Sequence, residues 1–201
     1  MDDQAEAVTP FPQLRTWLEE AKRVRVERLD IVVMCLSTCS RDARPTSRMV
    51  VAVQRGEDGI GFFTDRNSMK ARQLAENPFA STVMYFPALD RQIRVEGKVE
   101  GLPQSEADQF FKTLSREKQL MILLSEEGRQ FSSFQDVLQA KKEIVDKYEN
   151  VSVLPASSSL AGYLLVPSRF QFHQNRPDWV TDCVQFSKQE DGSWNKQQIL
   201  P

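Results

Sequence analysis

Three short segments between residues 47 and 70 carry side chains that suit the binding of a phosphate group. They are Ser47–Val51, Gly61–Thr64 and Asn67–Lys70. The first contributes Arg48, whose planar guanidinium binds phosphate oxygens with two parallel hydrogen bonds. The third is predicted to open a helix with Lys70 in its first turn, where unpaired amides and the helix dipole also favour an anion. We therefore expect this part of the chain to bind a phosphorylated small molecule.

Short strands and one helix are expected to position these side chains. Runs rich in β-branched and aromatic residues predict strands over 31–39, 46–54, 59–64, 79–87 and 92–100. A short helix is predicted from Ser68 to Glu76, and Asn77-Pro78 stops it. The last of these strands alternates between apolar and polar residues, so one of its faces must meet water or another polar group.

The remaining elements predict an antiparallel barrel with peripheral helices. Helical periodicity covers residues 10–26, 103–111, 117–124 and 134–148, and further strands are predicted over 162–166, 169–174, 182–187 and 194–200. Many short strands with helices inserted in the middle of the chain are typical of such a barrel. We expect a flexible N-terminus over 1–8 and a single domain over 9–201, with inserted helices at about 103–149.

Composition narrows the classes of function. The formal net charge of −2 argues against a nucleic-acid-binding surface, and no apolar run approaches the roughly 20 residues that span a bilayer. The acidic, polar N-terminus does not read as a signal or transit peptide, so we expect a cytoplasmic protein. Cys35 and Cys39 fall on one predicted strand about 13 Å apart, too far for a disulfide or a shared metal. His173 is the only histidine, so we expect no metal site.

Several separated segments resemble the pyridoxamine 5′-phosphate oxidase family. They are Pro10–Ala21, Ser47–Val50, Gly61–Thr64, Asn77–Ala80, Arg91–Gly97, Gly162–Pro167 and Trp194–Pro201. Members are FMN-dependent, homodimeric flavoproteins that make pyridoxal 5′-phosphate. The resemblance runs from about residue 9 to residue 201. It implies a mainly β, antiparallel, FMN-binding split barrel with peripheral helices, and it implies a homodimer.

Some positions that contact the cofactor in the family keep the family residue type in this chain, and others do not. It implies that FMN is bound by Arg48, Met49, Phe63, Thr64, Lys70, Gln92 and His173, with His173 in place of a family Trp. Four other positions lose the family residue type. Met69 replaces a phosphate-binding Arg, Glu127-Gly128 replaces a Gln-Ser pair, and Cys183 replaces a flavin-contacting Arg.

The substrate positions depart further from the family. A Lys, a Tyr, an Arg and a Ser that bind the substrate phosphate correspond here to Val53, Phe110, Leu114 and Lys118. The family's R-x-H motif falls on Trp179 and Thr181, although a gap would let Arg176 serve as its Arg. Lys118, as a substrate contact, and Arg176, as a catalytic residue, are therefore the weak candidates.

Ordinary structural roles compete with several of these assignments. Arg48 could be an ion-pair partner, Lys70 a solvated helix residue, and His173 a surface or interface histidine.

Three functions remain open. The first is an FMN enzyme that oxidises pyridoxine or pyridoxamine 5′-phosphate to pyridoxal 5′-phosphate with O2. The second is an FMN oxidoreductase with a changed substrate. The third is a paralogue that binds FMN or pyridoxal phosphate, or only dimerises, without catalysis. The retained cofactor residues favour the first two over the third, the lost substrate contacts disfavour the first, and we predict the family reaction as the default.

Overall fold

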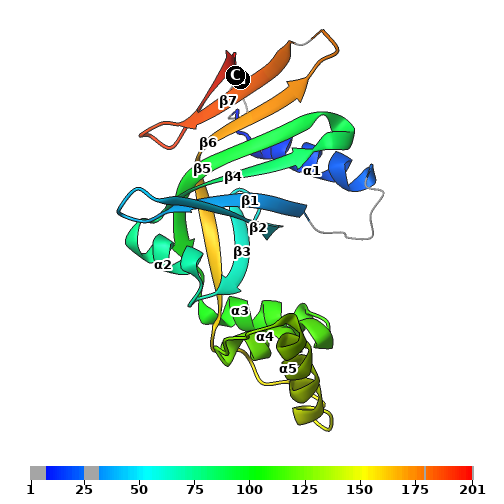
Figure 1. The fold of residues 1–201 in the computed structure, drawn as a ribbon. Coiled ribbons are helices and arrows are strands. Elements are labelled where there is room, and N and C mark those ends of the chain that lie inside the picture. The colour runs from blue at the N-terminus through cyan, green and yellow to red at the C-terminus, as the bar shows by residue number, and fades with distance from the viewer. Residues whose placement is uncertain (1–7, 25–31, 179, 201) are drawn as a thin grey trace, which may run out of the picture. The chain divides into compact units, whose positions relative to one another are not determined.

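The computed structural model describes residues 8–24, 32–178 and 180–200. Most of the predicted flexible segment 1–8 lies outside these ranges, as does Trp179. The helices are α1 (Phe11–Arg23), α2 (Met69–Glu76), α3 (Gln104–Thr113), α4 (Arg116–Glu126) and α5 (Phe134–Lys147), and η1 (Pro87–Leu89) is a short 3-10 turn. The strands are β1 (Val32–Cys39), β2 (Pro45–Gln54), β3 (Ile60–Asp65), β4 (Phe79–Phe86), β5 (Arg91–Gly101), β6 (Leu160–Asn175), β7 (Thr181–Lys188) and β8 (Trp194–Ile199) (Figure 1).

The strands form an antiparallel barrel, as predicted. Their order is β3-β2-β1-β4-β5-β6-β7-β8, and an additional pairing of β3 with β6 closes six of them into a barrel. Strands β7 and β8 continue the sheet beyond β6 as an antiparallel hairpin. Closure removes exposed sheet edges, which is the usual solution for a sheet of many short strands.

One strand differs from the sequence-based prediction. Residues 162–166 and 169–174 were expected as two strands, yet β6 runs unbroken through Pro167. The fixed φ of proline is compatible with extended backbone, and Gly97 on β5 lets the two strands pass closely. A Cβ at Gly97 would lie 2.0 Å from the Val166 carbonyl oxygen, so only glycine fits there.

Helix α1 contributes its apolar stripe to the core of the barrel. Phe11, Leu14 and Leu18 are buried at the spacing of one helical face. Phe11 packs edge-on against Phe170 of β6, with ring centroids 5.7 Å apart. In Figure 1 the helix accordingly runs beside strands of the sheet. This packing explains why the periodic pattern near the N-terminus forms a helix.

The described residues divide into two compact units. The first comprises those within Met1–Phe62, Arg72–Glu100 and Tyr163–Pro201, and the second comprises Phe63–Ala71 and Gly101–Gly162. The prediction of a single domain over 9–201 therefore stays a prediction. The predicted inserted helices are α3, α4 and α5, all in the second unit.

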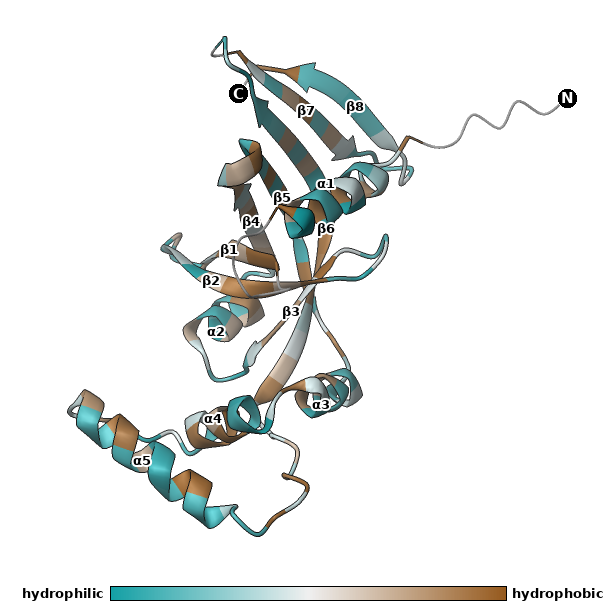
Figure 2. Cartoon of the chain, turned by 90° about the vertical axis from the view of Figure 1, so that its right-hand side faces the viewer, coloured by the Kyte–Doolittle hydropathy of each residue, from teal (hydrophilic) through white to brown (hydrophobic). Residues whose placement is uncertain are grey.

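The second unit has its own apolar core. Leu120, Leu123 and Leu124 of α4 are buried in it, together with Ala140 and Ile144 of α5. Figure 2 shows hydrophobic and hydrophilic bands alternating along α5, as expected of a helix with one face packed. None of the described helices has the length and apolarity that crossing a membrane requires.

Candidate functional site

Arg48 lies at the centre of a hydrogen-bonded network on the barrel strands. Its Nη1 donates to the Leu36 carbonyl oxygen at 3.1 Å and to Thr38 Oγ1 at 2.7 Å, and its Nη2 donates to Thr46 Oγ1. Gln73 braces the network, because its Oε1 accepts from Thr38 Oγ1 at 2.5 Å and from Thr46 Oγ1 at 2.8 Å. The guanidinium is therefore held in one orientation.

Within the described part of the chain, the acceptors around Arg48 leave its positive charge uncompensated. All three are uncharged oxygens, one carbonyl and two hydroxyls. Burial lowers the pKa of Arg48 from its usual value, which shows that holding the charge there has a desolvation cost. A partly buried cation bound only by neutral groups is suited to an anionic ligand, and the alternative role of Arg48 as an ion-pair partner gains no support from these contacts.

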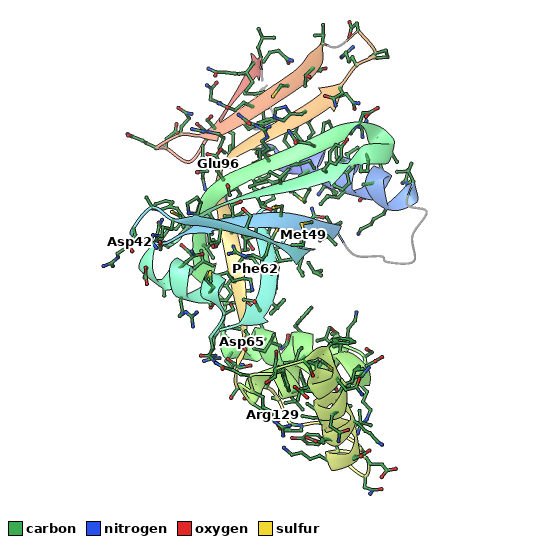
Figure 3. The ribbon with its side chains drawn as sticks, viewed as in Figure 1. Asp42, Met49, Phe62, Asp65, Glu96 and Arg129 are labelled. Carbon is green, nitrogen blue, oxygen red and sulfur yellow. The ribbon has the colours of Figure 1, made fainter. Side chains whose placement is uncertain are left out.

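Met49 points to the other face of β2. Met49, which is labelled in Figure 3, is 63% exposed, whereas Arg48 pairs in register with the buried Leu36. Consecutive strand residues face opposite sides of a sheet, so Arg48 and Met49 are presented on different surfaces. The structure therefore does not bring these two predicted cofactor residues together through their side chains.

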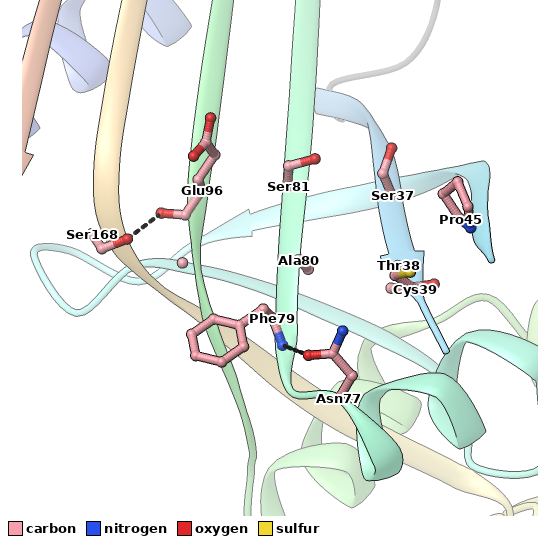
Figure 4. Close-up of a pocket in the computed structure, with 11 residues that line it drawn as sticks. Ser37, Thr38, Cys39, Pro45, Asn77, Phe79, Ala80, Ser81, Glu96 and Ser168 are labelled. Atoms are coloured by element: carbon pink, nitrogen blue, oxygen red, sulfur yellow. Dashed lines mark hydrogen bonds between the residues drawn. The ribbon is translucent and has the colours of Figure 1, made fainter. Parts of the chain in front are cut away.

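A pocket of about 420 Å³ lies beside the Arg48 network and shares Thr38 with it. Figure 4 shows its lining from β1, β4 and β5, including Ser37, Ser81 and Glu96. Arg169 pairs with the Glu96 carboxylate at 3.1 Å. The Glu96 carboxylate repels a phosphate, so we assign no anion to this pocket.

Two other predicted cofactor residues, Gln92 and His173, line one smaller pocket of about 180 Å³. Arg94 lines it too. With the Gln92 amide assigned the orientation that satisfies both of its ends, its oxygen accepts hydrogen bonds from Arg94 Nη2 and Nε, both at 3.0 Å. Gln92 and Arg94 share a face of β5 because they are two residues apart. The pocket thus combines a hydrogen-bonding amide, a cation and an aromatic ring.

His173 is buried and paired with a cysteine. It is only 4% exposed, and its Nε2 lies 3.5 Å from the Cys183 Sγ of the neighbouring strand. Burial, with a smaller contribution from the charge of Arg94, lowers the pKa of His173. Burial also raises the pKa of the Cys183 thiol. Both groups are therefore neutral at pH 7, and the role of a surface histidine is wrong for His173.

In the second unit, the predicted Thr64 and Lys70 are in contact. Lys70 Nζ donates to Thr64 Oγ1 at 2.8 Å. The chain between them turns at Asp65, whose Oδ1 accepts from the Asn67 amide at 2.6 Å, and Ser68 Oγ accepts from the Ala71 amide at 3.4 Å as α2 begins. An ammonium, a hydroxyl and a helix start therefore lie together, and their binding of a phosphate stays a prediction. Met69, which stands for a family Arg, is 55% exposed.

Phe63 stacks on an aromatic residue of the same unit. Its ring lies 4.0 Å from that of Phe110, with the planes 4° apart. Gly162 makes room for this pair, since a Cβ there would lie 2.8 Å from Phe63. Phe110 is one of the positions where the resemblance implies a lost phosphate contact, and the stack leaves it an apolar role.

The weaker candidates have structural partners. Arg176 donates to Asp182 at 2.6 Å, and it lines a different pocket from Gln92. The backbone amide of Lys118 donates at 3.4 Å to the Oγ of Ser115, the residue that caps α4. Trp179 lies outside the described residues. Neither Arg176 as a catalytic residue nor Lys118 as a substrate contact is tested by these contacts, and both stay predictions.

Other positions that depart from the family type are also accommodated. The Glu127 carboxylate pairs with Arg129 Nε at 2.9 Å and with Lys147 Nζ at 3.3 Å. Gly128 has a positive φ of 63°, a conformation that glycine adopts at low cost. The segment therefore forms a charged helix end that holds its carboxylate in ion pairs.

Sequence reasoning missed Arg94 and the partners of Arg48. Arg94 could have been found, because period-2 alternation places it beside Gln92. Thr38 and Gln73 gave no local signal, since they lie 35 residues apart in the chain and meet only in the folded barrel.

Comparison with protein-family models gives two matches. Residues 19–152 match the model described as pyridoxamine 5′-phosphate oxidase, and residues 161–201 match the pyridoxine 5′-phosphate oxidase C-terminal dimerisation region. The second match supports a homodimer.

Curated relatives agree with these matches. The pyridoxine-5′-phosphate oxidase of Bos taurus is 34% identical over 182 residues, which are 90% of this chain and 69% of that protein. The pyridoxine/pyridoxamine 5′-phosphate oxidase of a Synechocystis species is 34% identical over 192 residues, which are 96% of this chain and 88% of that protein.

Solved structures share the fold. PhzG from Burkholderia lata, in complex with tetrahydrophenazine-1-carboxylic acid, has a TM-score of 0.86 at 24% identity, covering 99% of this chain and 95% of that one. A pyridoxamine 5′-phosphate oxidase-related, FMN-binding protein from Nostoc punctiforme has a TM-score of 0.75 at 19% identity, covering 96% and 98%.

Proposed function

Because the chain belongs to the pyridoxamine 5′-phosphate oxidase family, we propose that it is an FMN-dependent oxidoreductase. Its default reaction is the oxidation of pyridoxine or pyridoxamine 5′-phosphate to pyridoxal 5′-phosphate with O2. Relatives that carry the corresponding names are 34% identical over most of the chain. The family is the one predicted from the sequence. The reaction that we propose is the reaction of that family.

The donor set of the described residues fits FMN. Arg48 offers a guanidinium that three neutral oxygens orient without neutralising, which suits a phosphate. Lys70 and Thr64 offer an ammonium and a hydroxyl, and Gln92 offers an amide for a heteroaromatic ring edge. When bound, FMN supplies a ring that accepts a hydride and passes electrons to oxygen.

The single observation that carries the assignment is the Arg48 network. A structural arginine on a barrel strand would be expected to pair with a carboxylate, because an uncompensated buried charge is costly. Arg48 is instead oriented by neutral groups that are themselves braced by Gln73. Such preorganisation is expected where an anionic ligand completes the site.

We propose further that the protein is a cytoplasmic homodimer without a nucleic-acid or membrane partner. The match of residues 161–201 to a dimerisation region supports the dimer. Light scattering after gel filtration should give about twice the chain mass of 23.1 kDa. A mass equal to one chain at micromolar concentration would reject the dimer.

Anaerobic reduction tests the reaction. The FMN-loaded protein is mixed with pyridoxamine 5′-phosphate without oxygen, and the visible absorbance of the oxidised flavin is followed. We expect the absorbance to bleach and to return when air is admitted. An FMN-loaded protein that stays oxidised at millimolar substrate would reject the family reaction but not FMN binding.

A second candidate function is oxidation of a less polar substrate on the same cofactor. It is favoured by the stack of Phe110 on Phe63, because a phenyl ring offers no hydrogen bond to a substrate phosphate. Substituting Phe110→Tyr adds one hydroxyl and distinguishes the two. Faster bleaching by pyridoxamine 5′-phosphate in F110Y would show that the family substrate is used but weakly held, whereas no bleaching in either protein favours the changed substrate.

A further inference from the structure

We propose that Arg94 is the positive charge of the Gln92 pocket and that it stabilises FMN in its reduced form. The inference rests on the proposed function and assigns a role to a side chain outside the predicted site.

The pocket is suited to one edge of a larger ligand. Its volume of about 180 Å³ is below the roughly 300–1,000 Å³ of sites that enclose a whole small molecule. Gln92, Arg94 and His173 line it together. An amide, a guanidinium and an imidazole provide hydrogen-bonding groups at one place, as the carbonyl-rich edge of a flavin ring requires.

Among the described residues Arg94 has no carboxylate partner, whereas the neighbouring arginine has one. Arg91 binds the Glu20 carboxylate, donates to Gln174 Oε1 at 2.5 Å and lies over the Trp17 ring at 4.6 Å. Arg94 instead donates to the neutral amide oxygen of Gln92. The charge of Arg91 is thus balanced by Glu20, and the charge of Arg94 is not balanced by Gln92.

The hydrogen bonds between the two side chains also fix their orientation. Both Nη2 and Nε of Arg94 donate to the Gln92 oxygen at 3.0 Å. The two donors occupy one edge of the guanidinium, so its remaining N–H groups face elsewhere. The Gln92 amide nitrogen is then directed away from Arg94. A ligand edge in the pocket would meet an oriented amide and a fixed cation.

The other groups of the pocket set the sign of the effect. His173 and Cys183 form a buried pair 3.5 Å apart that adds no charge. Asp90 lines the same pocket and contributes a carboxylate. Arg91 lines the pocket as well, but its charge is balanced by the Glu20 carboxylate. Removing the charge of Arg94 would therefore leave the Asp90 carboxylate unopposed, which disfavours the reduced flavin because reduction adds negative charge to the ring.

The test compares Arg94→Met with Arg94→Lys and a matched control. Lys98→Met removes an exposed cation from the same face of β5, outside the residues that line the pocket. For each FMN-loaded protein the two-electron reduction potential and the FMN dissociation constant are measured. R94M should weaken binding of reduced FMN about tenfold more than binding of oxidised FMN, a potential lower by about 30 mV. R94K and K98M should stay close to the wild-type potential.

The outcomes separate this inference from the proposed function. If wild-type protein takes up no FMN, both fail. If wild type binds FMN and R94M has the same potential as K98M, the role of Arg94 is overturned while the flavoprotein assignment stands. Equal shifts of the reduction potential in R94M and R94K would also overturn it. Lysine keeps the positive charge but lacks the guanidinium edge that orients Gln92, so that edge and not the charge would then be responsible.

Discussion

At the scale of single residues, Arg48 is the side chain on which cofactor binding depends most. Its guanidinium is oriented by Leu36, Thr38 and Thr46. A charge-assisted hydrogen bond contributes about 1.5–3 kcal/mol. We therefore expect Arg48→Met to raise the FMN dissociation constant roughly 10- to 150-fold in a fluorescence titration.

Arg15→Met is the matched control, because Arg15 is exposed on α1. Its FMN affinity should equal that of wild type. An R48M protein that binds FMN as tightly as R15M would show that Arg48 does not contact the cofactor.

His173 gives the fold a pH dependence of known sign. Its pKa is lowered by burial and by Arg94, so the folded protein keeps it neutral at pH values where the unfolded chain, with an ordinary pKa of about 6.5, takes up a proton. The contribution to stability is complete above pH 6.5 and is lost as pH falls toward the folded pKa. The loss is at most about 1.4 kcal/mol per pH unit.

Urea unfolding of the FMN-free protein at pH 7.5 and at pH 5.5 measures this effect. The same measurement is made on the variant His173→Gln. Carboxylates that titrate between the two pH values change the unfolding free energy of both proteins equally, so the difference between wild type and H173Q is the contribution of the histidine. H173Q should lose less stability than wild type on acidification. Equal losses would mean that His173 is not held neutral.

The family resemblance named Thr64, Lys70, Gln92 and His173 as cofactor residues, but the contact of Lys70 with Thr64 and the pocket shared by Gln92 and His173 became visible only in the structure. Residue types could not predict how Arg48 is held, because Thr38, Thr46 and Gln73 come from three elements that meet only in the folded barrel. For Cys183, which lies opposite His173, the sequence comparison showed only that it replaces a family arginine. Its pairing with the histidine depends on the register of β6 and β7.

At the scale of elements, the close passage of β5 and β6 depends on Gly97. An added Cβ would lie 2.0 Å from the Val166 carbonyl oxygen and 2.9 Å from the Pro167 Cα, so the strands would have to separate. Gly97→Ala should lower the free energy of unfolding by about 1–3 kcal/mol, as overpacking of a core does.

Gly101→Ala on the same strand is the comparison, because nothing lies within 4 Å of a Cβ there. It should change the free energy of unfolding by no more than about 0.5 kcal/mol. If both variants unfold at the same urea concentration, the passage of β5 and β6 is not close.

Helix α5 begins with a capping box that can be tested separately. Ser133 Oγ accepts from the Asp136 amide at 3.2 Å, and Asp136 Oδ2 accepts from the Ser133 amide at 3.0 Å. Ser133→Ala should cost about 1 kcal/mol, which speeds hydrogen exchange of α5 amides roughly fivefold. Ser132→Ala keeps its own backbone bond to Asp136 and should exchange like wild type. Identical exchange rates of the α5 amides in S133A and S132A would show that the capping box does not stabilise the helix.

Helices and strands could be predicted because the spacing of apolar residues within a short segment distinguishes the two. The five strands from β1 to β5 and all five helices lie close to their predicted ranges. The break expected near Pro167 was wrong, because the partner strand supplies a glycine 70 positions earlier in the chain. Sequence patterns report proline's local preference and not what the neighbouring strand permits.

At the scale of the whole molecule, two units share the predicted cofactor residues. Arg48, Gln92 and His173 belong to the first, and Thr64 and Lys70 belong to the second. Family membership is what joins them into one proposed function. The fold class could be predicted from alternating strands and a full-length resemblance. The division into units could not, because the boundaries fall within β3, α2, β5 and β6.

Titration of the FMN-free protein with FMN tests the central claim most directly. Quenching of flavin fluorescence should saturate at one FMN per 201-residue chain, and the isolated complex should be yellow. A protein that stays colourless, with flavin fluorescence unquenched at an FMN concentration well above that of the protein, would contradict the flavoprotein assignment.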